Sequence, residues 1–278
     1  MNDPVVAVIL CAGQATRFGG VVKQLLEIDG APLVQRTLNQ CAARGIPTWL
    51  ITHQPEVYEE AGIRARFFEP RGHRWTCETL YSTRDLWGTE QTIVLLGDVY
   101  YSDFCMDLLV KGETMFYTGE AEIWGMAIRR QYYDRAGKTL RRVLDLAAKR
   151  QDAEEHHCGQ LWRYYRVWYG LAYIGDWKIT PGLAFQRAGT TRVVFDETVD
   201  FDVPVTYERW QAGLRGRQVW WNAFRPGTSP GLPLWCEWLK GLRWEGEKWR
   251  CPKDGELHSG FKGCAPATCK YYDITKGG

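Results

Sequence analysis

Short apolar runs alternate with helical patterns through the first hundred residues of the chain. Uninterrupted apolar and β-branched runs, typical of strands buried on both faces, lie at 5–10, 48–52 and 92–96. Segments 32–44 and 78–86 place apolar residues at helical spacing, and Gly45 stands where a helix would be capped. This alternation predicts an α/β, Rossmann-like fold with a mostly parallel mixed sheet flanked by helices, in which ligands bind beyond the carboxyl ends of the strands.

The second half of the chain has a less regular pattern. Strands are predicted at 122–130, 166–174 and 193–203, with a basic amphipathic helix from about 138 to 150. A cluster of proline and glycine at 226–231 indicates a linker, followed by a segment rich in tryptophan and cysteine. We therefore predict a main domain at 1–225 and a small Trp/Cys-rich appendage at 226–278.

Composition narrows the class of protein. A chain of 278 residues with 45% hydrophobic content is long enough for one large α/β domain and a small appendage. The net charge of +2 gives no global signal for nucleic acid or an anionic membrane. The N-terminus has no basic leader and no apolar run reaches membrane-spanning length, so we expect a cytoplasmic protein without a membrane span. Nine cysteines, an odd number, then favour free thiols or a metal site over disulfides.

A loop of small residues directly follows the first predicted strand and carries Arg17, with Lys23 just beyond it. Small residues allow backbone N–H groups to approach a triphosphate, and the two cations supply the positive charge that its transition state needs. A dinucleotide loop is disfavoured, because the acidic residue expected after the second strand is absent. We predict Arg17 and Lys23 as catalytic residues. The nucleotide-binding residues predicted here are Leu10, Ala12, Gly13, Gln14, Ala15, Thr16, Arg17 and Lys23.

This loop resembles that of the nucleoside-triphosphate (NTP) transferases of GT-A-like fold, which include sugar-phosphate nucleotidyltransferases and the phosphocholine cytidylyltransferase type. The family loop reads Leu-Ala-Ala-Gly-x-Gly-x-Arg with a lysine a few residues later; here Cys11 replaces an alanine and Ala15 the second glycine. The resemblance continues at 78–82 and 97–100 and ends near Trp210. It does not separate CTP from UTP or GTP. The further nucleotide-binding residues that it implies are Arg71, Gly72, Glu78 and Asp98.

Acidic residues near two predicted strand ends are candidate metal ligands. Asp98 follows the strand at 92–96, where a carboxylate can hold Mg²⁺ against phosphate oxygens. The segment 200–204 resembles the family's Asp-x-Asp-Thr-Pro stretch, and in an extended strand Asp200 and Asp202 face the same side. We predict Asp98 and Asp202 as ligands of Mg²⁺, or of Mn²⁺ in its place, with Asp200 as a further candidate.

Basic and aromatic residues in the middle of the chain are candidates for binding the second substrate. Arginine suits an acceptor phosphate, and an aromatic cage suits a quaternary ammonium group. The acceptor would be a small phosphorylated molecule, such as a sugar 1-phosphate or a phosphocholine-like compound. The residues predicted for this role are Trp124, Arg129, Tyr165 and Trp168.

The C-terminal appendage contains four cysteines that two interpretations can explain. They could hold a structural Zn²⁺, which would stabilise a segment too small for a full core. Their irregular spacing, without a Cys-x-x-Cys pair, favours buried free cysteines beside tryptophans instead. These residues are Cys236, Cys251, Cys264 and Cys269.

The predicted function is transfer of a nucleoside monophosphate from an NTP to the acceptor with release of pyrophosphate. One alternative is a glycosyltransferase of the same fold, which would use a nucleotide sugar as donor and Asp200 and Asp202 as its metal-binding acids. Its acceptor could be a nucleic acid if the basic middle region of the chain contacts phosphates. Another is an inactive nucleotide-binding interaction module with the Trp-rich tail as its working surface. Arg17 and Lys23 favour the nucleotidyltransferase, because they suit a triphosphate and its leaving pyrophosphate. The sequence does not determine the oligomeric state.

Overall fold

The structure is a computed structural model of the 278-residue chain. It describes residues 3–13, 21–118, 123–149, 159–173, 191–194, 196–201, 204–212, 243–245, 248–250 and 257–259. The chain divides into two compact units, Met1–Val219 and Trp220–Gly278. The domain boundary predicted between residues 225 and 226 stays a prediction.

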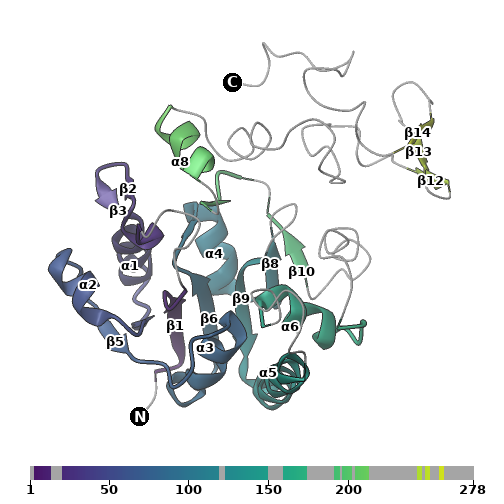
Figure 1. The fold of residues 1–278 in the computed structure, drawn as a ribbon, viewed down its shortest axis with the longest axis horizontal. Coiled ribbons are helices and arrows are strands. Elements are labelled where there is room, and N and C mark those ends of the chain that lie inside the picture. Colours follow the sequence, from purple (N-terminus) through teal and green to yellow (C-terminus); the bar gives the residue numbers. More distant parts are fainter. Residues whose placement is uncertain are drawn as a thin grey trace. The chain divides into compact units, whose positions relative to one another are not determined.

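A seven-stranded sheet forms the centre of the first unit, with strand order β10-β8-β9-β6-β1-β4-β5 (Figure 1). Neighbouring strands are parallel except at β9, which runs antiparallel to both β6 and β8. The predicted mostly parallel mixed sheet is therefore confirmed. The strands are β1 (Val5–Leu10), β4 (Thr48–Ile51), β5 (Arg66–Phe68), β6 (Gln91–Leu96), β8 (Phe116–Thr118), β9 (Ile123–Arg129) and β10 (Thr191–Val193).

Helices cover both faces of this sheet, which explains its apolar central strands. In β1, Ala7 and Ile9 belong to one core cluster and Val8 and Leu10 to another, so successive side chains point to opposite faces. The first cluster takes residues from α1 (Leu33–Ala43), α2 (Pro55–Glu60) and α4 (Asp103–Lys111); the second takes them from α3 (Thr76–Ser82), α5 (Tyr133–Ala148) and α6 (Leu161–Trp168). Within the described ranges, no helix is long and apolar enough to cross a membrane.

Several shorter elements complete the described chain. A two-stranded hairpin of β2 (Glu27–Ile28) and β3 (Ala31–Pro32) leads into α1. In the second unit, β12 (Arg243–Glu245), β13 (Lys248–Arg250) and β14 (Leu257–Ser259) form an antiparallel sheet. The remaining elements are β7 (Val99–Tyr100), β11 (Val199–Asp200), α8 (Pro204–Gln211) and the 3₁₀ turns η2 (Lys23–Leu25), η3 (Arg84–Leu86) and η4 (Arg130–Tyr132).

The prediction of a strand at 166–174 is wrong, because residues 166–173 contain the end of α6 and a turn. Leu161, Tyr164, Tyr165 and Trp168 are all buried, and their spacing of three, four and seven is that of one helical face. The helix ends before Gly170, which has a φ of +69° in the left-handed region that favours glycine. The buried apolar face of this helix begins at Leu161, five residues before the predicted strand.

The strand predicted at 193–203 is two short strands that belong to different sheets. β10 ends at Val193 and pairs with β8, whereas β11 begins at Val199 and pairs antiparallel with β7. Between them, the Thr198 N–H donates to Asp196 Oδ1 at 2.7 Å. This side-chain turn gives the chain an alternative to continuing the first strand.

Candidate active site

The carboxyl end of β1 is the point where the connections of the sheet change direction. The strands on either side of it are β4, which follows β1 in the main sheet, and β6, which comes later in the chain. In such sheets ligands bind outside the carboxyl ends of the strands, at the change of direction. Leu10 and Ala12 are buried there and Gly13 is exposed. The predicted loop residues Gln14, Ala15, Thr16 and Arg17 lie outside the described residues.

Lys23 and Asp98 form an ion pair at this edge. The Lys23 Nζ lies 2.5 Å from Asp98 Oδ2, and the side chains are 11% and 24% exposed, so both charges are largely withdrawn from water. Lys23 begins η2 after the glycine loop, and Asp98 lies in the turn between β6 and β7. The structure thus brings together a predicted catalytic residue and a predicted metal ligand that are 75 positions apart in the sequence.

Gly97 allows the turn that carries Asp98 to lie directly against the start of the glycine loop. A Cβ at this position would stand 2.4 Å from Cys11 Sγ and 3.1 Å from the Leu10 carbonyl oxygen, too close for either. Burial, and secondarily the negative charge of Asp98, raises the pKa of the Cys11 thiol. Cys11 is therefore a neutral packing residue, and its contact with Gly97 sets the separation between loop and turn.

Tyr101 fixes the other side of this turn. Its ring is fully buried, and its hydroxyl accepts a hydrogen bond from the Leu96 N–H at 2.8 Å and donates one to the Trp124 carbonyl oxygen at 2.5 Å. The hydroxyl thereby joins β6, β9 and the segment after β7. This role is not predictable from the sequence, because Tyr101 follows apolar residues like any core tyrosine.

Asp200 reaches the same edge through strand pairing. In the β7–β11 ladder, Asp200 lies opposite Val99, and the Phe201 N–H donates to the Asp98 carbonyl oxygen at 3.2 Å. Asp200 is 6% exposed. Of the three predicted carboxylates, Asp200 is thus on β11, and Asp98 is in the turn that leads into its partner strand β7. Asp202, the preferred second ligand, lies outside the described residues.

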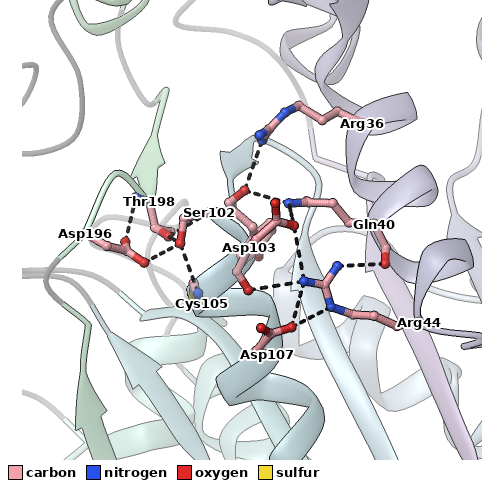
Figure 2. Close-up of polar contacts among 10 residues, drawn as sticks. Arg36, Gln40, Arg44, Ser102, Asp103, Cys105, Asp107, Asp196 and Thr198 are labelled. Atoms are coloured by element: carbon pink, nitrogen blue, oxygen red, sulfur yellow. Dashed lines mark hydrogen bonds and ion pairs between the residues drawn. The ribbon is translucent and has the colours of Figure 1, made fainter.

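A polar network supports this arrangement from α1. Arg36 Nη1 and Gln40 Nε2 both donate to the Tyr101 carbonyl oxygen, at 3.0 and 3.1 Å (Figure 2). Gln40 also donates to Asp103, and Arg44 forms an ion pair with Asp103 at 3.2 Å. These two partners lower the pKa of the Asp103 carboxyl. The network holds the helix that follows the β2–β3 hairpin against the start of α4, just beyond Asp98.

Ser102 connects the same point to the β11 strand. Its hydroxyl caps α4 by accepting from the Cys105 N–H at 3.0 Å, and it donates to Asp196 (Figure 2). The Ser102 N–H donates to Thr198 Oγ1 at 3.1 Å. These bonds tie the segment before Asp200 to the segment after Asp98. Asp196 was not predicted, although its position two residues before Thr198 is the local pattern of a side-chain turn.

The predicted residues after β5 form a loop against α3. Glu78 turns back so that its Oε2 accepts from the Arg74 N–H at 2.9 Å, and its side chain occupies the space where a Cβ on Gly72 would lie. Arg71 is exposed. A Cβ on Gly159 would similarly meet the Trp75 Cβ at 2.2 Å. Glu78, in the first turn of α3, therefore holds the loop that precedes this helix.

Two histidines stack beside this loop, at the carboxyl ends of β4 and β5. The rings of His53 and His73 lie 4.2 Å apart between centroids with 7° between their planes. Burial, and then the neighbouring His73, lowers the pKa of His53. The pair was not predicted, because the two histidines are 20 positions apart and neither lies in a motif.

The four predicted acceptor residues are not gathered at one point. Trp124 belongs to the core cluster on one face of the sheet, whereas Tyr165 and Trp168 belong to the cluster on the other face. Arg129 is exposed at the far end of β9, where it donates to the Lys111 carbonyl oxygen at 3.1 Å. An acceptor site built from all four is thus not formed in this structure.

The four cysteines that the structure describes in the first unit are buried free thiols. Cys11, Cys41, Cys77 and Cys105 form no disulfide, and burial raises the pKa of Cys41 to about 11. No group of three His, Cys, Asp or Glu side chains around a common point occurs among the described residues. The four cysteines of the predicted zinc site, Cys236, Cys251, Cys264 and Cys269, lie outside them.

Residues 7–110 match the family model of the MobA-like NTP transferase domain. The chain is similar in fold to the CTP:phosphocholine cytidylyltransferase of Streptococcus pneumoniae, with 14% identity over 76% of this chain and 100% of that one, and a TM-score of 0.48. It is also similar to the inositol-1-phosphate CTP transferase of T. maritima, with 11% identity over 79% and 94% of the two chains and a TM-score of 0.44. No curated protein sequence matches the chain significantly. The predicted resemblance to NTP transferases is confirmed, and with it the prediction of a nucleotidyltransferase enzyme.

Proposed function

We propose that the chain transfers a nucleoside monophosphate from an NTP to a small phosphorylated acceptor, such as a sugar 1-phosphate or a phosphocholine-like compound, and releases pyrophosphate. The observation that carries the proposal is the Lys23–Asp98 ion pair at the carboxyl end of β6, with Asp200 on β11, which pairs with the strand that follows Asp98. It lies beside the glycine loop of a segment that matches an NTP transferase domain. The cation and the acids have the chemistry that a triphosphate and its metal require.

In the proposed reaction an acceptor phosphate oxygen forms a bond to the α-phosphorus. The bond from that phosphorus to the oxygen bridging to the β-phosphate breaks, and its electron pair leaves with pyrophosphate. Lys23 has three N–H donors, so it can keep Asp98 as a partner while it donates to a phosphate oxygen. Arg17 would supply a second cation. No protein nucleophile takes part; the residues position the reactants and offset negative charge.

The donor set fits Mg²⁺, or Mn²⁺ in its place. Asp98 and Asp200 offer only carboxylate oxygens, and Mg²⁺ in such enzymes takes one or two carboxylates and completes its shell with phosphate and water. Asp202 would be a further ligand. When bound, the metal would polarise phosphate oxygens and offset the charge of the leaving pyrophosphate. The ion pair with Lys23 orients the Asp98 carboxylate.

The test is pyrophosphate release from each of the four NTPs with Mg²⁺, against a panel of sugar 1-phosphates, phosphocholine and related phosphorylated alcohols. Asp98→Ala should lower the rate by about 10²-fold or more, because it removes a carboxylate that would hold the metal ion against the reacting phosphates. Asp145→Ala is the matched control: Asp145 is an exposed acid that pairs with Arg141 on α5, so the rate should not change.

The outcomes separate this proposal from its alternatives. Release that requires both an acceptor and Asp98 would support it and identify both substrates. Hydrolysis or transfer from nucleotide sugars, with no release from any NTP, would support a glycosyltransferase instead. Binding of NTP without turnover across the panel would support an inactive nucleotide-binding module.

A further inference from the structure

A cleft of about 650 Å³ lies between the first half of α5 and the C-terminal end of α6. The two helices lie side by side (Figure 1). The Tyr133 hydroxyl, at the start of α5, hydrogen-bonds to Thr92 Oγ1 near the beginning of β6, whereas Ala147, near the end of α5, packs against Trp75 beside α3. The cleft is thus at the end of β6 opposite to Asp98 and is separate from the candidate active site.

The α5 side of the cleft is basic. Arg135, Lys138 and Arg142 all line it, and their spacing of three and four places them on one face of the helix. Asp134 is the single acidic residue among the lining residues. The cleft therefore carries an excess of positive charge, although the whole chain has a net charge of only +2.

The three cations differ in how they are engaged. Arg135 Nη2 donates to the Trp168 carbonyl oxygen at 2.7 Å, and its guanidinium lies 4.0 Å from the centre of the Trp168 ring, so it forms a fixed wall. Lys138 pairs with Asp134 at 2.7 Å, but both side chains are more than three quarters exposed, and such pairs are weak and exchangeable. Among the described residues, Arg142 forms no hydrogen bond or ion pair and is exposed.

From this geometry we infer a second binding site, for a small molecule that carries a phosphate or diphosphate group. A free guanidinium beside an exchangeable ammonium suits phosphate oxygens, because the first donates through a planar fork and the second as a compact charge. The volume is that of a small-molecule site, and Arg135 stacked on Trp168 gives it a flat wall. A nucleic-acid strand fits less well, since Asp134 and Asp145 interrupt the basic face.

This site is independent of the proposed function, since none of the residues that argue for it lies near Lys23 or Asp98. It can therefore be tested in a protein whose active site has been disabled. The probe is radiolabelled inorganic pyrophosphate, measured by equilibrium dialysis in EDTA with the full chain. The variants are Lys23→Met, Arg142→Ala in a Lys23→Met background, and Arg141→Ala in the same background.

Arg141→Ala is the matched control, because Arg141 adjoins Arg142, is exposed, pairs with Asp145 and does not line the cleft. Both variants remove the same charge from an exposed helix position, so neither should unfold the protein. We expect Lys23→Met to keep pyrophosphate binding, Arg142→Ala to weaken it about tenfold or more, and Arg141→Ala to change it less than twofold.

Three results would overturn the inference. Loss of all binding in Lys23→Met would place the pyrophosphate at the active site. Equal weakening by the two arginine variants would indicate a general effect of surface charge. Tighter binding of a single-stranded oligonucleotide, with the same dependence on Arg142, would replace the small molecule with a nucleic acid.

Discussion

The two ends of the central sheet place their charges by different means. At the carboxyl end of β6, Lys23 and Asp98 form a largely buried ion pair, and β7–β11 pairing brings Asp200 beside it. At the opposite end, Lys138 and Asp134 form a pair that is more than three quarters exposed on the surface of α5. Strand register and close packing fix the first set of charges, whereas helical spacing alone fixes the second.

This difference predicts where stability and function are coupled. Removing one partner of a partly buried ion pair leaves the other charge poorly solvated and lowers the free energy of unfolding. A change at Lys23 should therefore affect folding and catalysis together. Exposed charges on α5 are solvated in either case, so changes there should affect ligand binding with little effect on folding. Variants at the two ends can separate these effects.

The largest effect is expected for Lys23→Met. Removing this cation should lower the rate of nucleotidyl transfer by about 10²- to 10³-fold, since it takes a preorganised donor from the reacting phosphates. It should also lower the free energy of unfolding by about 1–3 kcal/mol, because Asp98 is left partly buried without its ion pair. Steady-state kinetics and urea denaturation measure the two effects.

The double variant Lys23→Met/Asp98→Asn is the control for this prediction. If the two side chains interact as the 2.5 Å contact indicates, the double variant should lose less unfolding free energy than the sum of the losses in the two single variants. Its activity should stay at the level of the poorer single variant. Strictly additive losses of stability would contradict the buried pair.

A second pair of variants compares glycines from the two ends. Gly97→Ala should destabilise the protein by about 1–3 kcal/mol, because the new methyl group would stand 2.4 Å from Cys11 Sγ and overpack the loop. Gly137→Ala, in the middle of α5, meets only Arg84 at 3.5 Å and should stabilise by about 0.5–1 kcal/mol through helix propensity. Equal effects on the free energy of unfolding, measured by urea denaturation, would contradict the difference in packing between the crowded turn at Gly97 and the uncrowded position at Gly137.

A third comparison uses two fully buried tyrosines. Tyr101→Phe should cost about 1–2 kcal/mol of unfolding free energy, since the Leu96 N–H and the Trp124 carbonyl oxygen both lose a partner. Tyr164 lies on α6, and its buried hydroxyl has no hydrogen-bond partner within the described structure. Tyr164→Phe should therefore be neutral or stabilising. Chemical denaturation of both variants tests this contrast, and a loss at Tyr164 equal to that at Tyr101 would refute it.

The same contrast explains what could be predicted from the sequence. The buried strands were predictable because residues such as Ala7 to Leu10 are apolar on both faces, which only a covered parallel sheet requires. Asp98 was predictable because it follows such a strand directly. Helix α6 was not predicted, because its apolar face begins at Leu161 and the predicted strand covered only the C-terminal part of the helix.

The remaining parts of the site depend on contacts between distant segments. Tyr101 bonds to Leu96 and Trp124, and Ser102 bonds to Asp196, nearly a hundred residues later. No local pattern reveals these partners, because each hydrogen bond joins segments that meet only in the folded protein. The placement of the predicted acceptor residues could not be read from the sequence for the same reason: Trp124 and Trp168 are both aromatic, but they belong to core clusters on opposite faces of the sheet.

The smallest effect is expected at the stacked histidines of the carboxyl edge. Burial and the neighbouring His73 lower the pKa of His53 in the folded protein below its unfolded value of 6.5. Between these two pKa values the unfolded chain binds more protons, so stability should rise with pH through this window and fall as pH drops below about 6.5. His53→Phe keeps a stacking ring without the titration. The unfolding free energies of wild type and His53→Phe are measured from pH 5 to 7.5. Their difference should move in favour of wild type as pH rises and level off above 6.5. A difference independent of pH would show that the stack does not penalise protonation of His53.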